Sequence, residues 1–298
     1  MLNFDSIVIG SGIAGMTASI YLKRANLNVL LIESTIPGGQ INRSSLVENY
    51  PGYKEIDGPT LSMNVFEQVS NLNVKYENES VLSVKKEDKL FRVKTSKNEY
   101  LTKTVIVASG RRPRELGLPN EHDLIGRGIS WCAYCDGFFQ KGKDVVIVGG
   151  GNSALEEALY LSNIANKIYI VLRSDKFRAD NYLQDKVFKK SNIEIIYNAN
   201  IKELITESDL LNGVLLDNGK TLKVTGVFEY IGSIPNTDFL KETNVNLNHD
   251  YIVVNNKMET NVEGMFACGD VINKDIYQLS TAVGEGTVAA NSASRYLD

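Results

Sequence analysis

The chain has 298 residues, 43% of them hydrophobic and 23% charged, and a formal net charge of −4. This length exceeds the usual size of a single domain, so two globular domains are expected. The weak negative charge argues against a broad nucleic-acid-binding surface, and no apolar run approaches the length of a membrane span. We therefore expect a soluble, cytoplasmic protein that binds neither nucleic acid nor membranes.

Residues 6–33 are predicted to form a strand, a helix and a second strand. The apolar, β-branched strand over residues 6–9 ends in a GxGxxG pattern, formed by Gly10, Gly12 and Gly15. The first glycine permits a tight turn, the second lets the backbone approach a pyrophosphate, and the third allows the helix to pack closely on the strand. Glu33, 18 positions after Gly15, would accept hydrogen bonds from a ribose diol. This unit therefore predicts a dinucleotide site.

Residues 130–139, SWCAYCDGFF, contain two cysteines with two residues between them. Only three cysteines and two histidines occur in the chain, which leaves too few ligands for a zinc site. The odd cysteine and the lack of a signal-peptide pattern argue against a structural disulfide in a secreted domain. Cys132 and Cys135 are therefore predicted to be an intracellular dithiol in which one thiolate attacks a foreign disulfide and the other resolves the mixed disulfide. No metal is expected.

A second unit of the same kind follows about 140 residues after the first. Its strand over residues 145–148 ends in a GxGxxA pattern, formed by Gly149, Gly151 and Ala154, and a further strand is predicted over residues 168–171. Two such units predict two dinucleotide cofactors.

The end of the second unit indicates which cofactor it binds. The spacing that leads from Gly15 to Glu33 leads here to Leu172, followed by Arg173 and, further on, Arg178. Arginines without an acid favour the 2′-phosphate of NADPH over the free hydroxyl of NADH. Solvated surface arginines after a strand remain an alternative interpretation.

Residues 264–298 contain a third segment of interest. GMFACGDVIN reads as a short strand that ends at Gly269 and Asp270, and residues 277–298 read as a helix with a face of small residues. If the first unit binds a flavin dinucleotide, Asp270 would hold its ribityl or phosphate end and the helix N-terminus would support the ring carbonyls. Cys268 is expected to be a buried structural thiol, whose replacement by serine leaves disulfide reduction intact.

The segments GSGIAG, PGGQI, CAYCDGFF, GGGNSALEEALYLSNIA, FRA and FACGDV, in this order, resemble the low-molecular-weight bacterial thioredoxin reductases over essentially the whole chain. The resemblance implies an α/β fold with two Rossmann-like dinucleotide-binding domains, in which the NADPH domain is inserted in the FAD domain. The FAD domain would comprise residues 1–113 and 242–298, and the NADPH domain, which carries the dithiol, residues 114–241. Residues 108–113 and 232–237 contain the glycine and proline typical of linkers.

The resemblance also implies the residues of the two cofactor sites. The FAD site would comprise Gly10, Ser11, Gly12, Ile13, Ala14, Gly15, Glu33, Ser34, Gly39, Gln40, Asn49, Gly110, Gly269, Asp270, Gln278 and Leu279. The NADPH site would comprise Gly149, Gly150, Gly151, Asn152, Ser153, Ala154, Arg173 and Arg178.

By the same resemblance, electrons pass from NADPH through FAD and the dithiol to thioredoxin or a thioredoxin-like protein, in a homodimeric enzyme. Cys135 would face the flavin, Cys132 would attack thioredoxin, and Asp136 would protonate a departing thiolate or the flavin-facing sulfur. This role needs a carboxylic acid whose pKa is raised by an apolar site. Neighbouring aromatic side chains would form that site unless they are ordinary core residues; they are Trp131, Phe138 and Phe139.

The family's inserted domain rotates to present either the nicotinamide or the dithiol to the flavin. The predicted hinges are Gly110 and Gly232, one in each of the two predicted linkers.

Two positions depart from the family's pattern. Of the three arginines in its 2′-phosphate clamp, HRRxxxR, only Arg173 and Arg178 are present, so NADH remains open as the donor. Tyr277 stands before Gln278 at a position where arginine is common, which leaves this flavin contact open.

Other functions also remain open. A ferredoxin-dependent thioredoxin reductase would keep the dithiol, but a disused nucleotide site would not need the intact second glycine pattern. The reductase component of a peroxide-scavenging system usually has an additional N-terminal thioredoxin-like region. A non-catalytic FAD-binding module would bind flavin without turnover.

Overall fold

The computed structural model describes residues 2–44 and 47–298, apart from the side chains of residues 2, 3, 43, 134 and 135. The chain divides into two compact units. The first unit comprises the residues up to Arg112 together with Ile234–Asp298, and the second unit is Pro113–Ser233. Along the chain, the second unit is therefore inserted in the first.

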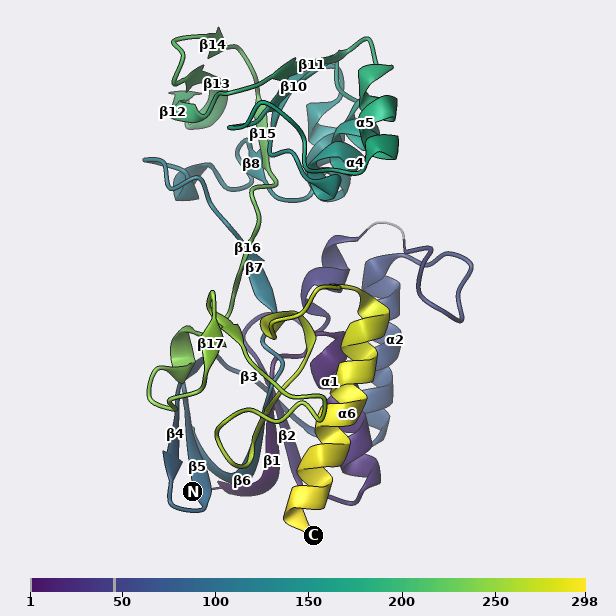
Figure 1. Ribbon diagram of the computed structural model, residues 1–298, viewed down its shortest axis with the longest axis vertical. Helices are drawn as coiled ribbons and strands as arrows, with labels where there is room; N and C mark the ends of the chain where they lie inside the picture. Colours follow the sequence, from purple (N-terminus) through teal and green to yellow (C-terminus); the bar gives the residue numbers. More distant parts are fainter. Residues whose placement is uncertain (1, 45–46) are drawn as a thin grey trace. The chain divides into compact units, whose positions relative to one another are not determined.

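A largely parallel sheet forms the centre of the first unit, with strand order β3-β2-β1-β6-β5-β4 and β19 also paired to β6. Its parallel strands are β1 (Leu2–Ile9), β2 (Val29–Glu33), β3 (Lys75–Asn78), β6 (Glu99–Val107) and β19 (Met265–Ala267). The antiparallel strands β4 (Val81–Glu87) and β5 (Leu90–Thr95) extend it. The helices α1 (Ile13–Arg24), α2 (Gly58–Asn71) and α6 (Leu279–Leu297) lie together beside the sheet (Figure 1).

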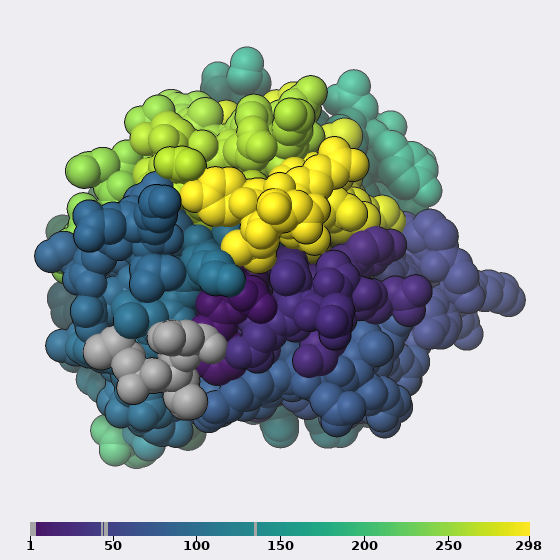
Figure 2. Space-filling view, turned by 90° about the horizontal axis from the view of Figure 1, so that it is seen from below, coloured from purple at the N-terminus to yellow at the C-terminus, as the bar shows by residue number. Residues whose placement is uncertain are grey.

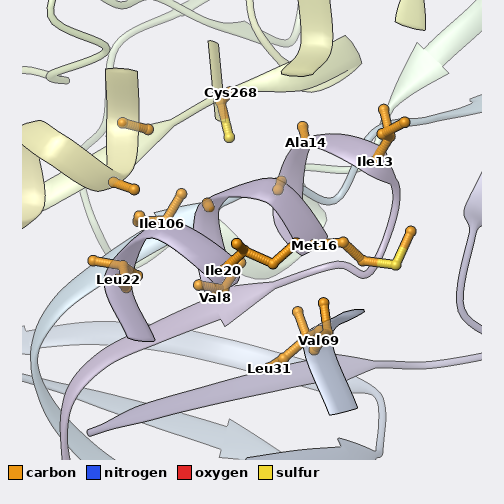
Figure 3. Close-up of a cluster of buried hydrophobic side chains, with 14 of the residues drawn as sticks. Val8, Ile13, Ala14, Met16, Ile20, Leu22, Leu31, Val69, Ile106 and Cys268 are labelled. Atoms are coloured by element: carbon orange, nitrogen blue, oxygen red, sulfur yellow. The ribbon is translucent and has the colours of Figure 1, made fainter. Parts of the chain in front are cut away.

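Alternation along the central strands divides the core of this unit into two layers. Val8, Leu31 and Ile106 point toward the helices and pack with Met16 of α1 (Figure 3). The residues between them face the opposite side and form a second cluster, with members Ile7, Leu30, Val105, Leu240 and Ile252. Because both faces of the parallel strands are covered, their apolar runs are nearly continuous. At the surface the C-terminal segment (yellow) lies against the N-terminal segment (purple), where α6 packs on α1 (Figure 2).

A parallel sheet with strand order β11-β10-β9-β15-β8 forms the centre of the second unit. The strands are β8 (Ile129–Ser130), β9 (Asp144–Val148), β10 (Lys167–Val171), β11 (Ile193–Ile196) and β15 (Gly226–Glu229). One face packs against the helices α3 (Ala133–Asp136), α4 (Asn152–Leu161) and α5 (Asn181–Phe188). The other packs against an antiparallel sheet of β12 (Ile201–Glu207), β13 (Leu210–Leu216) and β14 (Thr221–Leu222).

Short elements complete both units. Two-stranded sheets pair β7 (Arg111–Pro113) with β16 (Ser233–Pro235), and β17 (Leu247–Asn248) with β18 (Tyr251–Ile252). Turns of 3₁₀ helix lie at Gly39–Arg43, His122–Leu124, Gly137–Gln140, Asp238–Leu240 and Gly269–Val271. The predicted α/β class with two Rossmann-like units, one inserted in the other, is confirmed.

The chain returns from the second unit to the first after Ser233. This position is earlier in the chain than the domain boundary between residues 241 and 242 that the sequence suggested. Asn236 already belongs to the first unit. Its backbone N donates to Gly110 O at 3.0 Å, and its Nδ2 donates to Ser109 O at 2.9 Å.

Candidate functional site

A cavity of about 460 Å³ lies in the first unit, at the carboxyl ends of its parallel strands. This edge of an open α/β sheet is where dinucleotides bind. Of the residues predicted for the FAD site, the cavity is lined by Gly10, Gly12, Ile13, Ala14, Glu33, Ser34, Gly39, Gln40, Gly110, Gly269, Asp270, Gln278 and Leu279. The structure thus brings together residues from both ends of the chain.

The glycines of the first loop have different surroundings. A Cβ added at Gly15 would lie 1.9 Å from Gly10 O, so this residue packs against the loop rather than lining the cavity. Gly10 has φ +102° and abuts the carbonyl of Ala108. At Gly12 an added Cβ meets nothing within 4 Å among the described residues, and Gly12 lines the cavity. The open face at Gly12 is where a pyrophosphate could approach the backbone.

The carboxylate of Glu33 is held at the end of β2 by several donors. Its Oε2 accepts from the backbone N of Ser11 at 2.8 Å and from the Ser11 hydroxyl at 3.0 Å. Its Oε1 accepts from the backbone N of Thr35 at 3.0 Å. Ser11 is fully buried and does not line the cavity, so its part is to orient Glu33.

Asp270 lies in a cluster of charged residues at one side of the cavity. Its Oδ2 is 3.3 Å from Arg111 Nε, and its Oδ1 is 3.6 Å from Lys274 Nζ. Lys274 also pairs with Glu285 at 2.8 Å. Burial raises the pKa of Glu285, an effect that Lys274 partly offsets. Asp270 is therefore held between two cations.

Arg111 and Tyr277 form a contact that the sequence did not reveal. The Arg111 guanidinium stacks over the Tyr277 ring, 4.2 Å from its centroid, and both residues line the cavity. The buried Nε of Arg111 has its ion pair with Asp270 at 3.3 Å but makes no hydrogen bond in the described part of the chain. A bound ligand with an acceptor atom would satisfy it.

Gln278 and Asn49 meet at the start of α6. Asn49 Nδ2 donates to Gln278 Oε1 at 3.1 Å, and Gln278 caps the helix through Thr281. Asn49 itself does not line the cavity. Gln40 does, and its Nε2 donates to Arg111 O at 2.9 Å.

Further lining residues were not predicted: Thr35, Gly38, Ile41, Ser44, Ala108, Ser109, Arg111, Arg112, Asn236, Tyr277 and Ala282. Most of them neighbour a predicted residue along the chain. Thr35 and Gly38 could have been found by extending the predicted segments by a few positions.

The glycine-rich turn of the second unit lies between β9 and α4. Gly149 has φ +136° and its added Cβ would lie 2.3 Å from Tyr230 O, so this glycine allows two backbone segments to meet. At Gly151 an added Cβ meets nothing within 4 Å in the described residues, as at Gly12. Asn152 exchanges hydrogen bonds of 2.9 Å with Asp180, which ties the turn to the loop before α5.

The other residues predicted for this site surround the same turn. Ala154 is fully buried, Ser153 is exposed, and the O of Gly150 accepts from the backbone N of Arg178 at 2.7 Å. Arg173 and Arg178 both have exposed side chains without an ion pair or side-chain hydrogen bond in the described residues. Their charges are therefore available to an anionic ligand.

Cys132 is disulfide-bonded and 8% exposed. Cys135 lies in α3, but its side chain is outside the described part of the structure. Asp136, at the end of α3, accepts from the Ser130 hydroxyl at 2.5 Å. The same hydroxyl accepts from the backbone N of Cys132 at 3.0 Å. Ser130 therefore links the disulfide segment to the carboxylate.

The apolar surround expected from Phe138 and Phe139 is wrong, and so is their alternative place in the core. They are 73% and 68% exposed, because the turn at Gly137–Gln140 directs both rings into solvent. Trp131 is partly buried, and its Nε1 donates to Glu229 Oε2 at 2.9 Å. Asp136 thus has a polar partner in Ser130.

Cys268 is fully buried beside α1, among the side chains around Ala14 and Ile106 (Figure 3). Burial raises the pKa of its thiol. The predicted buried structural thiol is confirmed. Within the described ranges, no cluster of potential metal ligands occurs and no helix is long and apolar enough to cross a membrane.

The chain is similar in sequence to known proteins over its whole length. The model of the pyridine nucleotide-disulphide oxidoreductase family matches residues 4–286. The thioredoxin reductase of Bacillus subtilis (strain 168) is 41% identical over 300 residues, which cover 99% of this chain and 95% of that protein.

Two solved structures extend the comparison. The thioredoxin reductase of Lactococcus lactis superposes with a TM-score of 0.90 at 36% identity, covering 99% of both chains. A ferredoxin-flavin thioredoxin reductase from Clostridium acetobutylicum gives a TM-score of 0.56 at 32% identity, covering 99% of this chain and 98% of that one. This chain belongs to the pyridine nucleotide-disulphide oxidoreductase family and, within it, to the low-molecular-weight thioredoxin reductases.

Proposed function

We propose that this protein transfers electrons from NADPH, through FAD and the Cys132–Cys135 pair, to oxidised thioredoxin. The observation that carries the proposal is the disulfide at Cys132, held next to Asp136 in a unit that has its own nucleotide-binding turn. An enzyme that passes electrons to a protein disulfide needs this combination.

The residues of the first unit fit FAD. Gly12 leaves open space for a pyrophosphate at the start of α1, and Glu33 lies where a ribose would be bound. The buried Nε of Arg111 makes no hydrogen bond in the described residues beside its 3.3 Å ion pair with Asp270, which leaves it able to donate to a ligand. Asp270 and the N-terminus of α6 would hold the flavin half.

The second unit fits NADPH. Gly151 offers the same open approach as Gly12, and Arg173 and Arg178 would bind the 2′-phosphate. Bound FAD would accept a hydride from bound NADPH and supply two electrons to the disulfide.

The protein's own residues then perform a thiol–disulfide exchange. The Cys132 thiolate attacks the thioredoxin disulfide, so that a mixed disulfide forms and one thioredoxin sulfur departs as a thiolate. Cys135 attacks Cys132, which restores the enzyme's disulfide and releases the second sulfur. Asp136 donates a proton to a departing thiolate. Because Cys132 is buried, this exchange requires a change that uncovers it.

The same proposal covers the partner, the assembly and the location of the enzyme. Thioredoxin or a similar small protein is the partner, and the enzyme is a cytoplasmic homodimer, as the family resemblance implies. Light scattering of the purified protein tests the dimer.

An anaerobic titration of the purified flavoprotein tests the proposed donor. We expect NADPH to bleach the oxidised-flavin absorbance at lower concentration than NADH. In Arg173→Ala the preference for NADPH should fall about tenfold, because one charge-assisted contact to the phosphate is lost. Lys167→Ala, on β10 but paired with Glu194, is the control.

A preference for NADH would show that two arginines do not suffice for 2′-phosphate selection. Bleaching by reduced ferredoxin, and by neither nucleotide, would overturn NADPH as the donor.

A further inference from the structure

Tyr230 binds the backbone directly next to the redox disulfide. The N of Ala133, the residue after Cys132, donates to the Tyr230 hydroxyl at 3.0 Å. Ala133 is fully buried, and Tyr230 comes 97 positions later, immediately after β15. The hydroxyl therefore fixes the start of α3 from a different part of the second unit.

Glu157 on α4 reaches the same point. Its carboxyl lies close enough to the Tyr230 hydroxyl and the Ala133 amide for both to lower its pKa, although the hydrogen bond of that amide goes to Tyr230. Its Oε2 is buried and has no hydrogen-bond partner among the described residues. A buried carboxyl with an unsatisfied oxygen prefers its neutral form. Burial accordingly raises the pKa of Glu157 to about 7, so that its charge changes near neutral pH.

We propose that Tyr230 and Glu157 form a positioning pair for the redox disulfide, in which Tyr230 holds the backbone beside Cys132 and Glu157 binds a proton more tightly once the disulfide is reduced. The inference rests on the dithiol chemistry of the proposed function. It adds two positioning residues, neither of which contacts a cofactor in the proposed mechanism.

The proton balance follows from the charges. Two electrons break the S–S bond; one sulfur takes a proton and the other remains a thiolate. This new negative charge near an ionised Glu157 raises the affinity of that carboxylate for a proton. If Glu157 is ionised beforehand, reduction consumes two electrons and two protons, and the net charge of the site does not change.

Among the described residues, few other charges face Glu157. Glu156 on the same helix is exposed and also raises the pKa of Glu157, and Asp136 on α3 lies near Tyr230. The charged groups of the adjoining elements have other partners: Asp144 of β9 with Asn166, Lys167 of β10 with Glu194, and Lys186 of α5 with the Tyr182 ring. Glu157 is thus the carboxyl of α4 whose protonation should change when the disulfide is reduced.

The test measures the disulfide equilibrium directly, without NADPH or thioredoxin. The holoenzyme and Glu157→Gln are equilibrated anaerobically with mixtures of oxidised and reduced dithiothreitol at pH 6 and pH 8, and the alkylated peptide containing Cys132 is counted by mass spectrometry. We expect the two proteins to agree at pH 6, where Glu157 is neutral. At pH 8 the variant should be about tenfold easier to reduce, or about 30 mV.

Glu156→Gln is the matched control and should follow the wild type at both pH values. Tyr230→Phe should lower kcat for thioredoxin about tenfold at both pH values, without a change in KM, because Ala133 loses its acceptor. If Glu157→Gln follows the wild type at pH 8, the inference fails while the proposed function stands. If the wild-type disulfide does not exchange with dithiothreitol at all, the proposed function fails as well.

Discussion

At the scale of single residues, the proposed proton donor Asp136 is held by its immediate surroundings. Its carboxylate accepts from Ser130, which also binds the amide of Cys132. Asp136→Asn keeps this geometry but removes the proton that Asp136 is proposed to transfer. We expect kcat with thioredoxin to fall about a hundredfold while FAD content is unchanged. Asp88→Asn, on an exposed turn of the first unit, is the control. A variant with full turnover would exclude Asp136 as the proton donor.

A substitution at Arg111 tests whether the cavity of the first unit binds FAD. Arg111→Met removes the guanidinium stacked on Tyr277 and paired with Asp270. We expect the Kd for FAD, measured by flavin fluorescence on the FAD-free protein, to rise at least about tenfold, since a hydrogen bond to a charged group contributes about 1.5–3 kcal/mol. Arg114→Met, on an exposed residue outside the cavity, should leave the Kd unchanged. An unaltered Kd in Arg111→Met would show that Arg111 does not contribute to FAD binding.

Glu229 makes the stability of the protein depend on pH. It is 2% exposed and lies near Glu121, whose carboxylate accepts from the backbone amides of Leu116 and Leu118. Burial, and then the charge of Glu121, raise the pKa of Glu229 to about 9. The folded protein therefore keeps a proton that the unfolded chain releases. Stability from this group is complete below about pH 4.5 and falls as the pH rises toward 9.

Glu229→Gln imitates the protonated form and can still accept from Trp131. We expect its melting temperature to exceed that of the wild type by a margin that grows from pH 5 to pH 8, with a free-energy difference on the order of a few kcal/mol at the upper end. Glu203→Gln, on an exposed position of β12, should show no such trend. A margin that is constant with pH would mean that Glu229 is ionised in the folded protein.

At the scale of elements, the close contact between α6 and α1 shapes the wall of the cavity. The buried face of α6 consists of small residues, as its sequence predicted: Ala282, Gly286, Ala289, Ala290 and Ala293. An added Cβ at Gly286 would lie 2.4 Å from Ala14 O, a backbone atom of a residue that lines the cavity. The absence of a side chain at Gly286 thus permits the helix approach that positions Ala14.

Gly286→Ala should lower the unfolding free energy by about 1–3 kcal/mol because it overpacks this contact. The affinity of the protein for FAD should fall as well. Gly284→Ala, two positions away, meets nothing within 4 Å in the described residues. It should be neutral or stabilise the helix by up to about 1 kcal/mol. Urea unfolding of both variants measures the difference, and equal stabilities would contradict the packing argument.

At the scale of the whole molecule, the two chain crossings join the units. Gly110 and Gly232 lie in them with φ of +64° and +111°, a region that side chains with a branched Cβ strongly disfavour. If the second unit turns on these crossings during the reaction, Gly232→Val should lower thioredoxin turnover about tenfold and leave flavin content unchanged. Gly219→Val imposes similar strain in an exposed turn, at φ +84°, and is the control. Equal turnover in both variants would remove Gly232 as a hinge.

Features that depend on residues adjacent in the chain could be predicted from the sequence, and features that depend on distant residues could not. The two glycine-rich turns and the helices after them depend on neighbouring residues, and α1 and α4 begin directly after those turns. The exposure of Phe138 and Phe139 could not be predicted, because apolar residues after a buried segment suit a core position equally well. The bridging role of Ser130 could not be predicted from the sequence, because a serine hydroxyl links two groups only when the fold brings both of them close to it.

The sequence by itself determined the fold class, the two nucleotide-binding units and the burial of Cys268, because local periodicity, turn chemistry and ordered motifs depend on residues adjacent in the chain. The tertiary structure alone decided the contacts between distant segments. Arg111 meets Tyr277, Trp131 meets Glu229, and Tyr230 meets Ala133, each across about 100 positions or more. Such contacts arise because parallel strands far apart in the chain end at the same edge of a sheet, so their order, rather than the residues next to them, sets which side chains meet.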